Sequence, residues 1–199
     1  MPDKDLGPPL VALVVGSQGA YAVGPGLDEA WSLGDLVRRF QETTARVGPR
    51  WVVWSAASTL RRVVDGGVDV SRTWDLAEAH RLVHGGWWAT PGHVVAGCRG
   101  LDEADVPAAR TPRLSGFDGD LFDVAAVSKD TSSPAAGHLR ADALTWATDD
   151  ARLRELAVLA LECQTSQRQA LGRIGGSHVG RRGATAARRR GLSTHPVRT

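Results

Sequence analysis

The stretch RWVVWSAASTLRRVVDGGVDVSRTWDLAEAHRLVHGG, residues 50–86, decides the fold class. It opens with an apolar, β-branched run typical of a buried strand, and a short helical segment then runs to a glycine pair. Val68 and Val70 predict another short strand, and a helix begins near Asp75, whose side chain suits the N-cap position. This order of strand, helix, strand and helix is typical of an α/β domain.

An opening hairpin is predicted before this stretch. Residues 8–16, PPLVALVVG, form an apolar run closed by glycine, and residues 20–25, AYAVGP, predict a second strand beside it. A helix is predicted within residues 27–48, where Ser32 and Asp35 resemble a capping box and a Gly-Pro pair ends the segment. Its apolar residues at helical spacing are Leu33, Leu36, Val37 and Phe40. The sequence therefore predicts an α/β domain with a mixed sheet and flanking helices.

The second half of the chain changes character twice. Residues 88–139 lack periodicity and are rich in Pro, Gly, Asp and Ser, which predicts a long irregular linker. Order returns in a long helix, residues 151–171, and a basic tail, residues 172–199, has a composition that predicts disorder. The apolar face of the long helix is formed by Leu153, Leu156, Leu159 or Ala160, and Cys163.

The composition favours one globular domain with a real core. The chain has 199 residues, of which 42% are hydrophobic, and it has seven Trp. Four of these stand in apolar surroundings, which predicts that they fill the core. They are Trp31, Trp51, Trp54 and Trp74.

The charge is unevenly distributed. The net charge is +2, but residues 171–199 hold seven Arg and no acid. Residues 1–170 therefore hold 17 of the 24 basic side chains against all 22 acidic ones, a net charge of −5. A basic tail can bind nucleic acid through phosphate contacts. The residues that would do so here are Arg181, Arg182, Arg188, Arg189 and Arg190.

The sequence predicts a cytoplasmic protein without a membrane span. The start MPDKDLGPP lacks the basic residues and apolar run of a signal peptide. No segment reaches the roughly 20 apolar residues that a membrane helix needs. Cys98 and Cys163 have no CxxC spacing, so they indicate neither a zinc site nor a disulfide framework.

Few residue patterns suggest chemistry. His80 and His84 lie four apart and would share a helix face, as metal ligands can, but no third ligand follows at a suitable spacing. No dinucleotide, P-loop or nucleophile motif is present. The remaining candidates are acids: Asp118, Asp120 and Asp123 in the predicted linker, and Asp149 and Asp150 at the start of the long helix. Helix capping alone could explain the last two.

Three stretches carry a resemblance to a known family: LVALVVGSQGAYAVGP at 10–25, RWVVWSAASTLRRVVDGGVDVSRTWDLAEAHRLV at 50–83, and LTWATDDARLRELAVLALE at 144–162. In this order they resemble the 3'-5' exonuclease domain of family A DNA polymerases, and they are closest to bacterial bifunctional 3'-5' exonuclease/DNA polymerase proteins. The first is similar to that domain's opening hairpin. The second is similar to its N-x-x-x-D and F-D-T segments, and the third to its Y-x-x-x-D segment and long helix. The resemblance implies an RNase H-like sheet, with residues 1–150 as the exonuclease-like domain.

The resemblance also implies where an active site would lie. In that family, four carboxylates hold two divalent metal ions that activate water, and a Tyr helps to position the nucleophile. The Asp-x-Glu of the first strand would fall within residues 14–17, which read VVGS and hold no acid. Ser55 and Thr59 stand where the second segment has Asn and Asp. Trp146 stands where the Tyr belongs, and Asp150 matches the Asp of the third segment.

One carboxylate cannot offset the dehydration of two Mg²⁺ ions, so the sequence predicts a non-catalytic, exonuclease-like domain from a polymerase of DNA replication or repair. Neither a metal nor a small-molecule cofactor is expected, and DNA is the expected partner if any binding is retained. The family continues after the long helix into a polymerase module. Here a 28-residue basic tail follows instead, which suggests a truncated remnant.

Two alternatives stay open. An active 3'-5' exonuclease would need Mg²⁺ held by Asp150 together with acids from the predicted linker. A small nucleic-acid-binding protein would instead bind through its Arg-rich tail.

Overall fold

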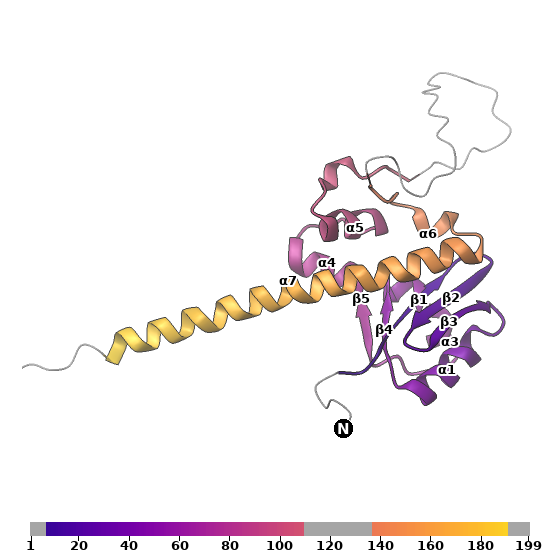
Figure 1. Cartoon of the computed structure of the whole chain (residues 1–199), viewed down its shortest axis with the longest axis horizontal. Coiled ribbons are helices and arrows are strands. Elements are labelled where there is room, and N and C mark those ends of the chain that lie inside the picture. The colour runs from indigo at the N-terminus through magenta and orange to yellow at the C-terminus, as the bar shows by residue number, and fades with distance from the viewer. Residues whose placement is uncertain (1–6, 110–136, 191–199) are drawn as a thin grey trace, which may run out of the picture.

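Five strands form one mixed sheet in the order β3-β2-β1-β4-β5 (Figure 1). The computed structural model describes residues 7–109 and 137–190, with side chains described as far as residue 174. The central strand β1 (Leu10–Val15) is antiparallel to β2 (Gly19–Gly24) and parallel to β4 (Arg50–Val53). The edge strands are β3 (Leu27–Ser32), antiparallel to β2, and β5 (Thr73–Asp75), parallel to β4. The predicted mixed α/β sheet is confirmed.

Helices cover both faces of the sheet, because β1 and β4 are apolar on both sides and successive side chains point to opposite faces. On one face, the core includes Val11 and Val53 and is covered by α1 (Leu36–Val47) and α3 (Arg61–Asp65). On the other face, the core includes Val14 and is covered by α4 (Leu76–His84), α5 (Pro91–Arg99), α6 (Ala143–Trp146) and α7 (Asp150–Arg190). Figure 1 shows the first part of α7 crossing the sheet.

The four Trp residues assigned to the core pack as predicted. Trp51 is stacked on Phe40 with ring centroids 4.3 Å apart, and Trp31 meets the Trp51 ring edge-on at 6.3 Å. Trp54 is buried in the opposite face. Trp74 is half-buried, and its indole N–H donates to Gln167 Oε1 of α7 at 3.0 Å, which ties β5 to the long helix.

The beginning of the helix predicted within residues 27–48 is instead the edge strand β3. This strand follows β2 through a two-residue turn in which Gly26 has a φ of 70°. Leu27 and Trp31 are both buried and lie four residues apart, a spacing that fits one face of a strand as well as one face of a helix. Periodicity alone could not separate the two, and pairing with β2 decides for the strand.

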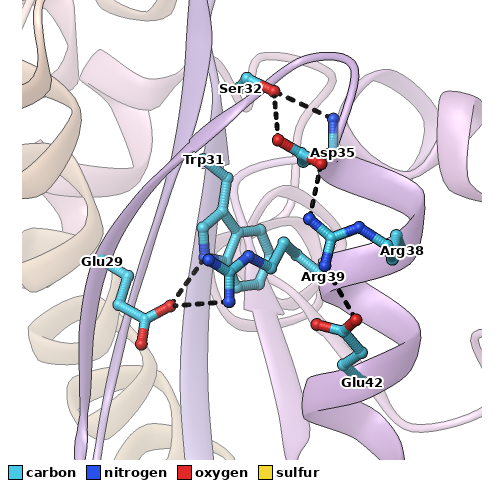
Figure 2. A network of polar contacts seen from close by, with 7 residues as sticks. All are labelled: Glu29, Trp31, Ser32, Asp35, Arg38, Arg39 and Glu42. Atoms are coloured by element: carbon cyan, nitrogen blue, oxygen red, sulfur yellow. Dashed lines mark hydrogen bonds and ion pairs between the residues drawn. The ribbon is translucent and has the colours of Figure 1, made fainter.

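A network of exposed polar contacts connects β3 with the start of α1 (Figure 2). The Ser32 hydroxyl accepts from the Asp35 N–H at 3.1 Å and donates to the Asp35 carboxylate at 2.8 Å. This is the predicted contact between the two residues, placed just before the helix. Arg38 lies 2.6 Å from Asp35 and holds the pKa of that carboxyl below its usual value. Since these groups are exposed, the ion pair contributes little to the free energy of unfolding.

The strand predicted around Val68 and Val70 lies further along the chain, at β5. The two valines are half-buried and pack from the preceding loop against the α1 side of the core. Val52 pairs with Trp74 in the parallel register of β4 and β5. Apolar side chains on a loop can thus fill a core without strand pairing.

Helix α5 corrects the prediction of an irregular linker over residues 88–139. Pro91 occupies the first turn of the helix, where its missing N–H costs nothing, and Gly100 ends the helix with a φ of 67°. Val94 and Val95 are buried against the sheet. Proline therefore begins a helix here. Residues 110–136 lie outside the described part of the chain.

Helix α7 carries the predicted apolar face and is longer than predicted. Its buried residues include Leu153, Leu156, Ala160 and Cys163. The helix continues through residues 172–190, where the composition favours disorder, and it extends beyond the sheet in Figure 1. Six Arg and three Ala in residues 172–190 favour a helix and five Gly disfavour one, so helix propensity alone does not account for the difference.

Candidate functional site

A cavity of about 300 Å³ lies at the carboxyl end of β1. Three segments that are far apart in the sequence form it: the turn after β1, the short helix α2 (Ala56–Thr59), and α6. They meet because the parallel strands β1 and β4 end at the same edge of the sheet. We call this the β1-end cavity, and its lining residues are Val15, Gly16, Ser17, Ser58, Thr59, Leu144 and Thr145.

The lining of the β1-end cavity is made of hydroxyl and aliphatic groups. Ser17, Ser58, Thr59 and Thr145 supply the hydroxyls. A hydroxyl oxygen is neutral, so it offers little against the free-energy cost of dehydrating a divalent cation. This set of side chains suits hydrogen bonding and does not suit holding two metal ions.

The backbone at Gly16 is closely covered by the segment that joins α6 to α7. A Cβ atom built on Gly16 would lie 2.6 Å from the Ala147 carbonyl oxygen and 3.0 Å from Leu153 Cδ2. Both distances are shorter than an ordinary van der Waals contact. The Gly16 N–H also donates to the Gly19 carbonyl at 2.8 Å, which tightens the turn after β1. A side chain of any size at position 16 would therefore displace the start of α7.

Ser55 immediately precedes α2 and Thr59 is its last residue, and Asp75 holds this helix in place. Ser55 takes the N-cap position with an extended backbone, and Thr59 is buried with an exposed fraction of 6%. One carboxylate oxygen of Asp75 accepts from the Ala56 N–H at 2.8 Å, and the other accepts from the Glu78 N–H at 3.1 Å. The predicted N-cap of α4 is confirmed, and the same carboxylate also caps α2.

Trp146 and Asp150, the two positions that keep the family's pattern best, are not among the residues that line the β1-end cavity. The Trp146 indole N–H donates to the Asp142 carboxylate at 2.7 Å, and the ring is 36% exposed. Asp150 is the exposed first residue of α7. Its neighbour Asp149 accepts from the Arg152 N–H at 2.8 Å, so Asp149 serves as the cap of this helix.

A polar cluster that the charge of Asp150 reaches joins Tyr21 of β2 and Asp28 of β3 to Arg154 of α7, and no pattern in the sequence predicts it. Arg154 makes a bidentate contact with Asp28, with N···O distances of 2.9, 3.0 and 2.7 Å. This contact holds the pKa of Asp28 below its usual value. The Asp28 carboxylate in turn raises the pKa of Tyr21, and the charge of Asp150 acts on Tyr21 in the same direction. Because 126 residues separate Asp28 from Arg154, no local signal could have revealed this pair.

His80 and His84 lie on one face of α4 as predicted, with ring centroids 4.7 Å apart in a stacked arrangement. His80 is fully buried, and neither ring nitrogen has a hydrogen-bond partner, although Nε2 lies 3.4 Å from Glu103 Oε1. Burial lowers the pKa of His80, and the nearby Glu103 carboxylate opposes this shift. Within residues 7–109 and 137–174, no three His, Cys, Asp or Glu side chains are grouped in a way that could hold a metal ion.

The other predicted positions fall outside what the structure describes. Asp118, Asp120 and Asp123 lie in residues 110–136. The five Arg residues of the predicted nucleic-acid-binding tail lie on the distal part of α7, beyond the last described side chain. They are Arg181, Arg182, Arg188, Arg189 and Arg190. Among the helices of the described residues, none has the length and apolar character to cross a bilayer.

No family model, curated protein or solved structure matches this chain. The geometry of the β1-end cavity is therefore the main basis for inferring a function.

Proposed function

We propose that this chain is a non-catalytic domain of the exonuclease type found in family A DNA polymerases, with the fold retained and the metal-dependent reaction lost. The sheet supports this proposal, since an antiparallel meander followed by two parallel strands is the arrangement that an RNase H-like domain would have. The convergence of the three resembling segments on one cavity supports it further.

The observation that carries the proposal is the chemistry of the β1-end cavity. Where the family would place carboxylates from the first two segments, this cavity offers Gly16, Ser17, Ser58 and Thr59. Two-metal hydrolysis needs negatively charged oxygen ligands from several segments, because these bind the ions that activate water and stabilise the leaving oxygen. A cavity lined by hydroxyl and aliphatic groups cannot hold the ions that activate water and stabilise the leaving oxygen.

Crowding at the end of β1 adds a second argument. The Ala147 carbonyl and the Leu153 side chain occupy the space that a side chain at position 16 would need. The start of α7 thus covers a position within residues 14–17, where the resemblance would place acids, and an acidic side chain there would require this segment to move.

The test is a nuclease assay on 3'-recessed and single-stranded DNA labelled at the 5' end, with Mg²⁺ or Mn²⁺. We expect no stepwise shortening by the full chain. Asp150→Asn removes the carboxylate that matches the family, and Asp149→Asn is its matched control because Asn also caps a helix. Digestion that depends on the metal and disappears only in Asp150→Asn would overturn the proposal. Equal weak digestion by the wild type and by both variants would indicate a contaminating nuclease. The expected result, no digestion by this chain itself, would then stand.

A further inference from the structure

The two cysteines of the chain lie against each other where α5 packs on α7, although 65 residues separate them in the sequence. The Cys98 thiol donates to the Cys163 carbonyl oxygen at 3.6 Å. One turn further along α7, the Ser166 hydroxyl donates to the Cys98 carbonyl oxygen at 3.4 Å. These contacts hold the end of α5 in a defined position on α7. Both thiols are free.

The two thiols are in different environments. Cys163 is buried with an exposed fraction of 1%, whereas Cys98 is half-buried and can be reached from solvent. The Cys163 thiol lowers the pKa of Cys98, and burial of Cys98 opposes this shift. The contact with Cys98 and burial raise the pKa of Cys163. Cys98 is therefore the thiol that an oxidant meets first, and Cys163 is its shielded partner.

We propose that Cys98 and Cys163 form a redox site in which a hydroperoxide oxidises Cys98 and Cys163 then closes a disulfide between α5 and α7. This site is independent of the β1-end cavity and of the function proposed for it. An accessible thiol that can ionise, placed next to a second thiol that can resolve the oxidised form, is the arrangement that reversible thiol oxidation requires.

The reaction balances in two steps. In the first, the Cys98 sulfur attacks one peroxide oxygen and the O–O bond breaks. Cys98 becomes a sulfenic acid, and the other oxygen leaves as water or an alcohol with the thiol proton. In the second, the Cys163 sulfur attacks the Cys98 sulfur, the S–O bond breaks, and water leaves with the Cys163 proton. The two thiols lose two electrons, and the hydroperoxide gains them.

The disulfide would join the end of α5 to α7. Since the closed loop spans 65 residues, the cross-link would restrict the unfolded chain substantially. It would also prevent α5 from separating from α7. We therefore expect the oxidised protein to unfold at a higher urea concentration than the reduced protein, and a dithiol reductant to reverse the change.

The experiment treats the reduced full chain with hydrogen peroxide, quenches it, denatures it and alkylates the remaining thiols. We expect both thiols to be lost together, and the mass to fall by two hydrogen atoms. Peptide mapping without reduction should recover one linked pair that contains Cys98 and Cys163. Wild-type protein that keeps both thiols at a peroxide dose that oxidises free cysteine would overturn the proposal, as would covalent dimers in place of the internal link.

Three variants assign the steps. In Cys163→Ser, Cys98 should stop at the sulfenic acid and be captured by dimedone. In Cys98→Ser, the buried Cys163 should stay reduced at the dose that oxidises the wild type. Ser166→Ala keeps both thiols and removes the hydrogen bond to the Cys98 carbonyl oxygen, so it should loosen the end of α5 on α7 and slow the closure of the disulfide without slowing the first oxidation of Cys98. Equal oxidation of Cys163 with and without Cys98 would contradict the assigned order. If a cysteine variant does not fold, the linked peptide of the wild type still decides whether the disulfide forms.

Discussion

Replacing Gly16 with alanine tests whether the start of α7 has closed over the end of β1. The added Cβ would lie 2.6 Å from the Ala147 carbonyl oxygen, a backbone atom that cannot rotate away as a side chain could. Either β1 or the segment that joins α6 to α7 must shift. Overpacking of this kind in a core costs about 1–3 kcal/mol.

The matched control is Gly34→Ala, in the turn between β3 and α1. A Cβ at this position would meet nothing closer than the Ser32 hydroxyl at 3.8 Å, and Gly34 is not among the glycines with positive φ. Alanine there should be neutral or should stabilise the fold by up to about 1 kcal/mol, because it reduces the freedom of the unfolded chain.

Urea unfolding followed by Trp fluorescence measures both variants. With a slope of about 2 kcal/mol per molar urea, the middle of the usual range, Gly16→Ala should lower the midpoint by about 0.5–1.5 M. Gly34→Ala should not lower it. If the two midpoints agree, α7 does not close over the end of β1, and crowding at Gly16 no longer supports the loss of an active site. Gly16→Asp, which restores an acid, should destabilise at least as much and should confer no nuclease activity.

Two further perturbations test the packing around α4. Asp75→Ala removes the acceptor for the N–H groups of Ala56 and Glu78, so we expect the free energy of unfolding to fall by about 2–4 kcal/mol in urea titrations. Asp75→Asn, which keeps one acceptor oxygen, should lose less, and equal losses would contradict the double cap. Burial lowers the pKa of His80 from its ordinary 6.5, so the unfolded chain takes up a proton first as the pH falls. The free energy of unfolding should therefore decrease as the pH falls below about 7, by about 1.4 kcal/mol for each pH unit, until the pH reaches the folded pKa. His80→Leu should remove this dependence relative to the wild type, and an unchanged pH profile in the variant would show that His80 is not its source.

Local signals in the sequence were sufficient to predict several helices and strands. The apolar run of β1 is buried on both faces, and the cap at Asp75 and the apolar face of α7 lie where the pattern places them. Each depends on neighbours within a few residues, through alternation, helical spacing or a side chain that bonds its own backbone. The residue types around the end of β1 are also a property of the sequence alone. Residues 14–17 contain no acid, and this is true whatever fold the chain adopts.

Other elements could be assigned only from the tertiary structure. The spacing of Leu27 and Trp31 fits a helix and a strand equally well, and only pairing with β2 makes β3 a strand. Pro91 can end a helix or begin one, and the core above the sheet decides that α5 forms. In both cases two local conformations have similar free energies, so long-range burial selects between them.

The residue types available for a site follow directly from the sequence, whereas the packing of distant elements selects which of these residues come together. Ser17, Thr59 and Thr145 are brought to one cavity by the parallel pairing of β1 with β4 and by the return of α6 to the same edge. Cys98 meets Cys163 because α5 and α7 cover the same face of the sheet. Such contacts join residues tens of positions apart, and packing of the whole core, which no local pattern encodes, stabilises them.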